Sequence, residues 1–157
     1  MFDRLKSIAK KATEISPNSI VVEVVKDTNV QRYILDLNRV DQLFLEGSDV
    51  EGVALGKYSL YTELINERNS FTYGGVTKRK TRGEHYFLFD SGDFFKTFKV
   101  KIKSDGFAIF ANEILPDGTN IFLKFGDVIG LTDENKTVLA RYILPNIREV
   151  VRRNLLR

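Results

Sequence analysis

The stretch that decides the fold runs from Leu88 to Asn112 and reads LFDSGDFFKTFKVKIKSDGFAIFAN. Asp90 or Ser91 can accept a hydrogen bond from a free amide of the turn that follows, and Asp93 places negative charge near the positive end of that turn. We therefore predict a short helix at about residues 91–97. One side of this helix carries phenylalanines at positions 94, 95 and 98.

From Phe98 onward the apolar period changes from helical spacing to two. Apolar residues at 98, 100 and 102 alternate with lysines at 99, 101 and 103. The dipeptide Asp105-Gly106 favours a two-residue type I′ turn, because both central residues of that turn need positive φ. The pattern predicts a central β-hairpin at about residues 98–112, with one core face and one lysine face.

A turn at Asp105-Gly106 would pair Ile102 with Ile109 and Lys101 with Phe110. Phe110 is then a large aromatic residue on the lysine face. Either it lies under lysine stems, or another element or another chain covers it. Phe110 and Lys101 are therefore candidates for a subunit interface.

Length and composition indicate one domain over residues 1–157, of which 43% are apolar. The chain has no cysteine, so disulfides and thiolate metal sites are excluded and a reducing or redox-indifferent compartment is expected. The opening residues contain no long apolar run, so we expect a soluble protein made in a cytoplasm, with no signal peptide and no membrane span.

The net charge of +3 is too small to predict nucleic-acid binding by itself. Basic residues are nevertheless grouped, and such groups are usually solvated faces. They occur on the predicted hairpin, at Lys78, Arg79, Lys80 and Arg82, and at Arg148, Arg152, Arg153 and Arg157 near the end of the chain.

Three helices are predicted before Gly47. The first is amphipathic, carries Phe2 and Leu5 on its apolar side, and ends by residue 16 because Pro17 follows. Residues 19–25 fit either a strand or a short helix, with helix preferred. The third begins with a capping box at residues 28–31, and its wet side includes Asn38.

The remaining elements complete an α+β fold. A short helix opens at Ser59 or Thr62, a mobile basic loop spans about 69–84, and a strand is expected at 85–89. A turn at 115–119 and an apolar, glycine-broken connector at 121–130 follow the hairpin. A long helix capped at 132 spans about 132–155, with a kink expected at Pro145.

Motifs for catalysis or metal binding are weak. His85 is the single histidine, and the chain has neither a Gly-x-Ser-x-Gly elbow nor a cysteine to partner it. The acidic turn at residues 49–52 lacks the other ligands of a calcium loop. The pair Gly74-Gly75 before Lys78 lacks the spacing of a phosphate-binding loop. We therefore predict no enzyme, cofactor or metal site.

The central stretch resembles the signature of tailed-phage virion morphogenesis and tail-completion proteins: a leucine, Ser/Thr-Gly, a short helix and a hairpin turning at Asp-Gly. LGKYSLYTELINERN, at residues 55–69, is similar to the family's aromatic turn and Ser/Thr-led helix. FLKFGDVIGLTDENKTVLARYIL, at residues 122–144, is similar to its apolar connector, cap and closing helix. The similarity covers about residues 37–156, and the version seen here looks closest to forms carried by phages or prophages of Bacteroidetes.

The sequence departs from the family in three places. The family's upstream tryptophan is absent, its Arg-Pro-Phe-Leu step is replaced by residues 121–126, and the basic segment at 78–82 is additional.

The resemblance implies a structural virion subunit at the neck or upper tail, which forms a homo-oligomeric ring that connects head and tail. Neighbouring portal, neck or tail proteins would be its partners, and the host cytoplasm its place before assembly. In a ring, Lys78, Arg79, Lys80 and Arg82 would contact DNA in the channel without reading bases, while Phe110, Lys101, Phe2 and Leu5 would contact the next subunit. A small nonspecific DNA-binding or regulatory module is the alternative.

Overall fold

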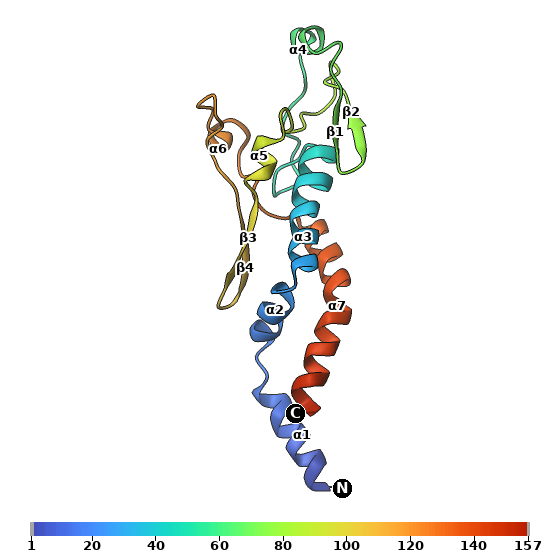
Figure 1. Cartoon of the computed structure of the whole chain (residues 1–157), viewed down its shortest axis with the longest axis vertical. Helices are drawn as coiled ribbons and strands as arrows, with labels where there is room; N and C mark the ends of the chain where they lie inside the picture. Colours follow the sequence, from blue (N-terminus) through green and yellow to red (C-terminus); the bar gives the residue numbers. More distant parts are fainter. Residues whose placement is uncertain (1, 157) are drawn as a thin grey trace.

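The computed structural model describes residues 2–156, with side chains from residue 5 onward, and shows an elongated α+β molecule (Figure 1). Its strands form two separate two-stranded antiparallel hairpins. Helix α1 lies at one end of the long axis beside the end of helix α7, and helix α4 lies at the opposite end. The predicted α+β class is confirmed.

The elements follow one another along the chain in an order that places most helices in the first third and the last quarter. They are α1 (Phe2–Glu14), α2 (Pro17–Val25), α3 (Thr28–Asp36), the π-helix η1 (Leu37–Glu46), α4 (Leu60–Ile65), β1 (Phe71–Tyr73), β2 (Val76–Lys78), α5 (Asp93–Lys96), β3 (Lys99–Lys103), β4 (Gly106–Phe110), α6 (Ile121–Phe125) and α7 (Asp133–Leu156).

The bounds of the first three helices lie close to those predicted. Residues 17–25 form a helix, the preferred of the two alternatives for that segment. The predicted capping box is wrong. Asp27 caps α3 by accepting a hydrogen bond of 2.7 Å from the backbone nitrogen of Asn29, while the Gln31 side chain donates to the carbonyl oxygen of Val25. An aspartate one residue earlier thus satisfies the free amide, so Thr28 becomes the first helical residue.

Helix α3 continues without a break into η1, which ends where Gly47 adopts a left-handed conformation with φ of +66°. Asn38 is fully buried, which corrects its predicted exposure. It lies four residues after the buried Ile34, so the two side chains share the core face of the continuous helix, and Gln42 is buried one turn later.

These two amides join η1 to the segment before α7. Asn38 donates a hydrogen bond of 3.1 Å to the carbonyl oxygen of Val128, and Gln42 accepts one of 3.1 Å from the backbone nitrogen of Thr132. Asn135 in turn donates to the carbonyl oxygen of Leu37. We call these contacts the polar seam. The Val128 carbonyl and the Thr132 amide, which lie outside any helix or strand, are satisfied there.

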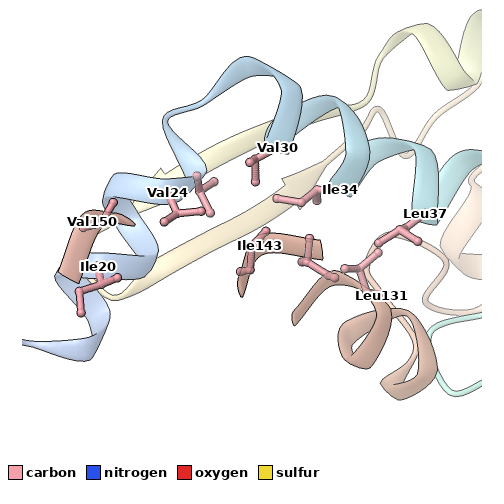
Figure 2. Packing of buried hydrophobic residues seen from close by; sticks show 10 residues of the cluster. Ile20, Val24, Val30, Ile34, Leu37, Leu131, Ile143 and Val150 are labelled. Atoms are coloured by element: carbon pink, nitrogen blue, oxygen red, sulfur yellow. The ribbon is translucent and has the colours of Figure 1, made fainter. Parts of the chain in front are cut away.

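The lower half of the molecule has an aliphatic core between α2, α3, α7 and the inner face of the β3–β4 hairpin (Figure 2). Helix α7 is capped as predicted, by the Thr132 hydroxyl accepting from the backbone nitrogen of Asn135, and it continues through Pro145. The buried members of this cluster are Ile20, Val24, Val25, Val30, Ile34, Leu37, Leu131, Leu139, Ile143 and Val150.

The upper half has an aromatic core that surrounds the end of η1. Helix α5 contributes its phenylalanines as predicted, and the Ser91 hydroxyl accepts a hydrogen bond from the backbone nitrogen of Asp93 at its start. The expected strand at 85–89 is absent, since that segment forms an isolated bridge between His85 and Lys57 and is otherwise irregular. Its aromatic side chains, including the buried Phe87, pack into the core from this irregular backbone.

The central hairpin is confirmed, but its register is shifted by two residues. Ile102 pairs with Phe107 and Val100 with Ile109, with the turn at residues 104–105. This register brings Val100, Phe107 and Ile109 against the lower core and pairs Phe107 with an isoleucine, whereas the predicted one would have placed Phe107 opposite a serine. Both registers keep the same residues on each face because they differ by an even number.

Residues 69–84, predicted as a loop without regular structure, contain the β1–β2 hairpin. Tyr73 pairs with Val76 across Gly74-Gly75, and Phe71 is buried in the aromatic core. The connector at 121–130 likewise contains the one-turn helix α6. In both segments an aromatic or aliphatic side chain enters the aromatic core, which orders the backbone beside it.

Candidate assembly surfaces

The basic segment at residues 78–82 divides into inward and outward side chains. The Lys78 ammonium donates hydrogen bonds of 3.1 and 2.9 Å to the carbonyl oxygens of Phe44 and Leu45, at the last turn of η1. It also lies 5.2 Å from the centre of the Phe87 ring. Burial lowers the pKa of Lys78, and the carboxylate of Glu84 opposes that shift. Lys78 therefore acts as a cap for the negative end of η1.

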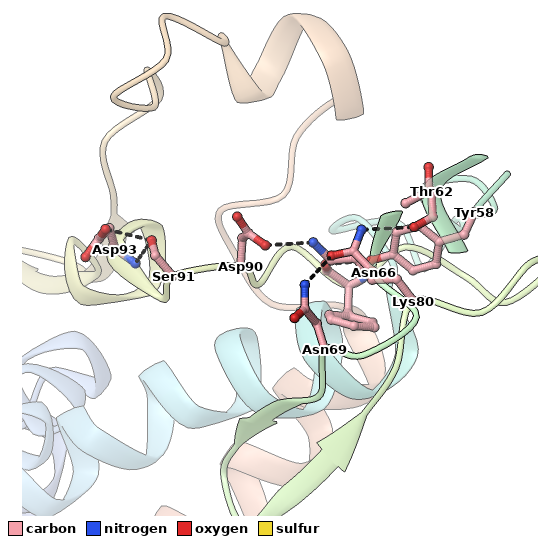
Figure 3. A network of polar contacts seen from close by, with 9 residues as sticks. Tyr58, Thr62, Asn66, Asn69, Lys80, Asp90, Ser91 and Asp93 are labelled. Atoms are coloured by element: carbon pink, nitrogen blue, oxygen red, sulfur yellow. Dashed lines mark hydrogen bonds and ion pairs between the residues drawn. The ribbon is translucent and has the colours of Figure 1, made fainter. Parts of the chain in front are cut away.

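Lys80 is also engaged. Its ammonium lies 2.8 Å from a carboxylate oxygen of Asp90 and 4.3 Å from the centre of the Phe71 ring, and its side chain is 14% exposed (Figure 3). Arg79 and Arg82 are exposed. Of the four predicted DNA-contacting residues, the structure thus places two on the surface and two in contacts that hold the upper half together.

The lysine face of the central hairpin is exposed, and Phe110 lies on it at 45% exposure. The ammonium of Lys101 is 4.9 Å from the centre of the Phe110 ring, which brings these two predicted interface residues together. Because the register is shifted, Lys101 pairs with Ala108 and the contact with Phe110 is diagonal. A lysine stem over the ring is one of the two arrangements expected for Phe110.

Leu5, the other predicted interface residue that can be placed, is 56% exposed on α1. The side chain of Phe2 lies outside the described residues. Next to Leu5 along α1, Ile8 faces the end of α7 and closes a groove of about 390 Å³. We call it the α1–α7 groove; it is lined by Ile8, Ile147, Arg148, Val151, Arg152, Leu155 and Leu156.

Helix α4 forms a second apolar surface, at the opposite end of the molecule. Ser59 caps it by accepting a hydrogen bond of 3.2 Å from the backbone nitrogen of Thr62, as the sequence predicts. None of its residues is buried. We call its apolar side the α4 ridge; it consists of Leu60, Tyr61, Leu64 and Ile65, which are 49%, 71%, 60% and 60% exposed. Sequence reasoning predicted the helix but missed this exposure.

A larger hollow of about 560 Å³ separates α6 from the segment at residues 86–94. It is lined by aromatic residues and by Lys80, Lys124 and several acids. Tyr58 lines the hollow and both accepts from the backbone nitrogen and donates to the carbonyl oxygen of Phe87, at 3.1 Å each. Burial raises the pKa of Tyr58 to about 12. This phenol ties the irregular segment to the aromatic core.

The weak chemical motifs stay separate in the structure. His85 is exposed, and the acidic turn is an Asx-type turn in which Asp49 accepts from the backbone nitrogens of Glu51 and Val53. Among the side chains described, those of residues 5–156, no group of three or more histidine or acidic residues is arranged to hold a metal ion.

Comparison with known proteins adds no relative: no protein-family model, no curated protein and no solved structure matches the chain. Among the helices of the described part of the chain, none combines the length and the apolar character that crossing a bilayer requires.

Proposed function

We propose that this chain is a structural virion protein of a tailed phage, a ring-forming subunit at the neck or upper tail that joins head to tail. The observation that carries the proposal is the placement of exposed apolar side chains at both ends of an elongated molecule. Contiguous exposed apolar surface marks protein contacts, and a ring needs two different patches on each subunit. The family resemblance of residues 37–156 supplies the virion setting.

The shape of the two halves supports a scaffold role. Each half has its own packed core, and the polar seam joins them through residues far apart in the chain. Such a body can present the α4 ridge and the α1–α7 groove in a constant orientation, as a repeated subunit must. The central hairpin adds a third exposed surface, with Phe110 and its lysines.

DNA contact would fall on the lysine face of the hairpin and on Arg79 and Arg82, which are exposed. These cations attract phosphates without reading bases, which suits either a DNA channel within a ring or the alternative, a small nonspecific DNA-binding module. A gel shift with the isolated protein that weakens steeply with added salt favours the module. Lys78 and Lys80 are unsuitable positions for this test, because changing them removes internal contacts.

The direct test of the virion role is made in the phage or prophage that encodes the chain. We expect electron micrographs of particles carrying a tagged copy to show label at the junction of head and tail. Deleting the gene should leave filled heads and separate tails. Purified infectious particles that lack the protein by mass spectrometry, or a normal titre after deletion, would overturn the proposal.

A further inference from the structure

We infer that the α4 ridge of one copy docks into the α1–α7 groove of a second copy, and that this head-to-tail contact links the subunits of the ring. The inference rests on the proposed function and adds to it the partner and the two surfaces. Both surfaces consist of described side chains, and they lie at opposite ends of the long axis (Figure 1).

The α4 ridge has the form of an insertion element. Leu60 and Leu64 form one row along the helix and Tyr61 and Ile65 form the next, because residues four apart share a face. Every one of them is at least 49% exposed, although the helix is capped and ordered by its own hydrogen bonds. Folding of the single chain therefore leaves about half or more of each side chain on this apolar helix face exposed to solvent.

The α1–α7 groove has the complementary form. Ile147, Val151 and Leu155 make one row along α7 at spacings of four, and Ile8 of α1 closes the other side. Leu156 stands at its mouth with 59% exposure. A short helix laid along such a row packs side chains between those of its partner, as ridges of one helix pack into grooves of another.

Charge selects a second copy as the occupant. Beside the ridge, Glu63 and Glu67 lie one turn apart on α4 and just past its end, and beside the groove Arg148 and Arg152 lie one turn apart on α7. Both the acids and the arginines are four residues apart in the sequence, so two acid–arginine pairs can form when the ridge enters the groove. Complementary charges at the edge of an apolar contact set its register and reject like-charged partners.

Neither charged pair is fully used within one molecule. Glu63 accepts one hydrogen bond, of 3.1 Å, from the backbone nitrogen of Arg82. Arg152 reaches Glu149 only at 4.0 Å, with both side chains more than 60% exposed. Exposed pairs of this kind contribute little, so both surfaces remain able to bind an opposite charge.

Contact between unlike surfaces on identical chains has a specific consequence. It is heterologous, so it closes into a ring when the rotation between neighbours divides a full turn, and it otherwise extends as a filament. The contact is small, because one short helix fills one groove. A single junction is therefore expected to be weak, and closure of the ring or neighbouring proteins must stabilise the assembly.

The test uses a separate variant for each of the two surfaces. One variant, Tyr61→Ser/Leu64→Ser, removes the ridge, and another, Arg148→Glu/Arg152→Glu, reverses the groove. Leu123→Ser is the matched control, since Leu123 is 89% exposed on α6 and belongs to neither surface. Sedimentation velocity is measured for each full-length protein at roughly 10–500 µM, the range in which small contacts associate.

We expect the unmodified chain and the control to self-associate, and each surface variant to lose self-association by at least about tenfold in dissociation constant. Mixing the two surface variants should give a one-to-one dimer that grows no further, because the mixture holds one intact ridge and one intact groove per pair. The four-residue exchange Glu63→Arg/Glu67→Arg/Arg148→Glu/Arg152→Glu should restore assembly within one chain. Circular dichroism checks that every variant keeps the helical content of the unmodified protein.

An unmodified chain that stays monomeric throughout this range overturns the inference, and so does a mixture of the two variants that does not associate. Assembly that is unaffected in both surface variants overturns it as well. In the last case the proposed function stands if label still appears at the head–tail junction, so the two failures are distinguishable.

Discussion

Replacing Lys78 with methionine tests whether the basic segment is structural. Methionine keeps most of the apolar stem but removes the ammonium. That group donates to the carbonyl oxygens of Phe44 and Leu45 and lies over the Phe87 ring. We expect a lower free energy of unfolding, because the part-buried carbonyl at the end of η1 loses its donor.

The magnitude follows from the contacts. A hydrogen bond from a charged donor contributes about 1.5–3 kcal/mol when its acceptor is buried. The exposed Leu45 carbonyl can exchange its bond for one to water, so it adds about 0.5 kcal/mol. The ring contact adds about 0.5 kcal/mol at a part-exposed site. Because the contact to the Phe44 carbonyl is only part-buried, the lower end of the first range applies, and the total loss is about 2–2.5 kcal/mol.

Urea unfolding followed by far-ultraviolet circular dichroism measures this loss. With a slope of about 2 kcal/mol per molar urea, the midpoint should fall by about 1 M. Arg79→Met is the matched control, since Arg79 is exposed one residue away and should change the free energy of unfolding by less than about 0.5 kcal/mol. The folded state disfavours the Lys78 charge, so the unmodified protein should gain stability relative to Lys78→Met as pH rises towards 10.5. Equal midpoints for both variants would refute the capping role of Lys78.

Three further outcomes follow from local geometry. Gly47→Ala should lower the free energy of unfolding by at least about 3 kcal/mol in the same urea assay, because the new Cβ would meet the carbonyl oxygen of Tyr86. Gly83→Ala, with a similar positive φ and open space, should lower it by only about 1–2 kcal/mol; equal losses would contradict the steric reason. Stability should fall between pH 10 and 12 and fall less in Tyr58→Phe, because burial keeps the phenol protonated in the folded state after the unfolded chain has lost that proton. Gln42→Met should cost about 1–2 kcal/mol, since it removes the acceptor for a buried amide, and no change in the unfolding midpoint would contradict this.

Local chemistry made the central stretch predictable from sequence. The phenylalanine spacing, the serine cap and the alternation with lysine each predict the same elements, and the structure contains them. The register was missed because it depends on which residues pack on the lower core. Phe107 and Ile109 both pack there, and this selects a turn one residue earlier than the glycine suggests.

The remaining errors come from tertiary contacts that a periodic pattern cannot show. Asn38 was placed on the wet side because it is polar, although it lies four residues after the buried Ile34. Its hydrogen bond to the distant Val128 carbonyl oxygen makes the burial possible, and no local pattern predicts that contact. In the sequence, Lys78 is one of several neighbouring basic residues that are expected to be solvated. In the structure, the β1–β2 hairpin directs its side chain towards η1. A signal for that hairpin was present, since Gly74-Gly75 lies between a tyrosine and a valine, but three-residue strands are too short to show alternation.

The polar seam bears on whether the chain can build a closed ring at all. A heterologous contact closes at one copy number only if its two surfaces keep a fixed angle, and here the α4 ridge extends from the upper half while the groove belongs to the lower half. The seam crosses between them through Asn38, Gln42 and Asn135. Apolar residues at these positions would cost less free energy to bury, because Asn38 and Gln42 each keep one polar atom without a partner among the described residues. The hydrogen bonds of the amides are directional, so they form only in one arrangement of η1 against the segment before α7. A loosened seam should therefore broaden the distribution of assembly sizes before it unfolds the subunit.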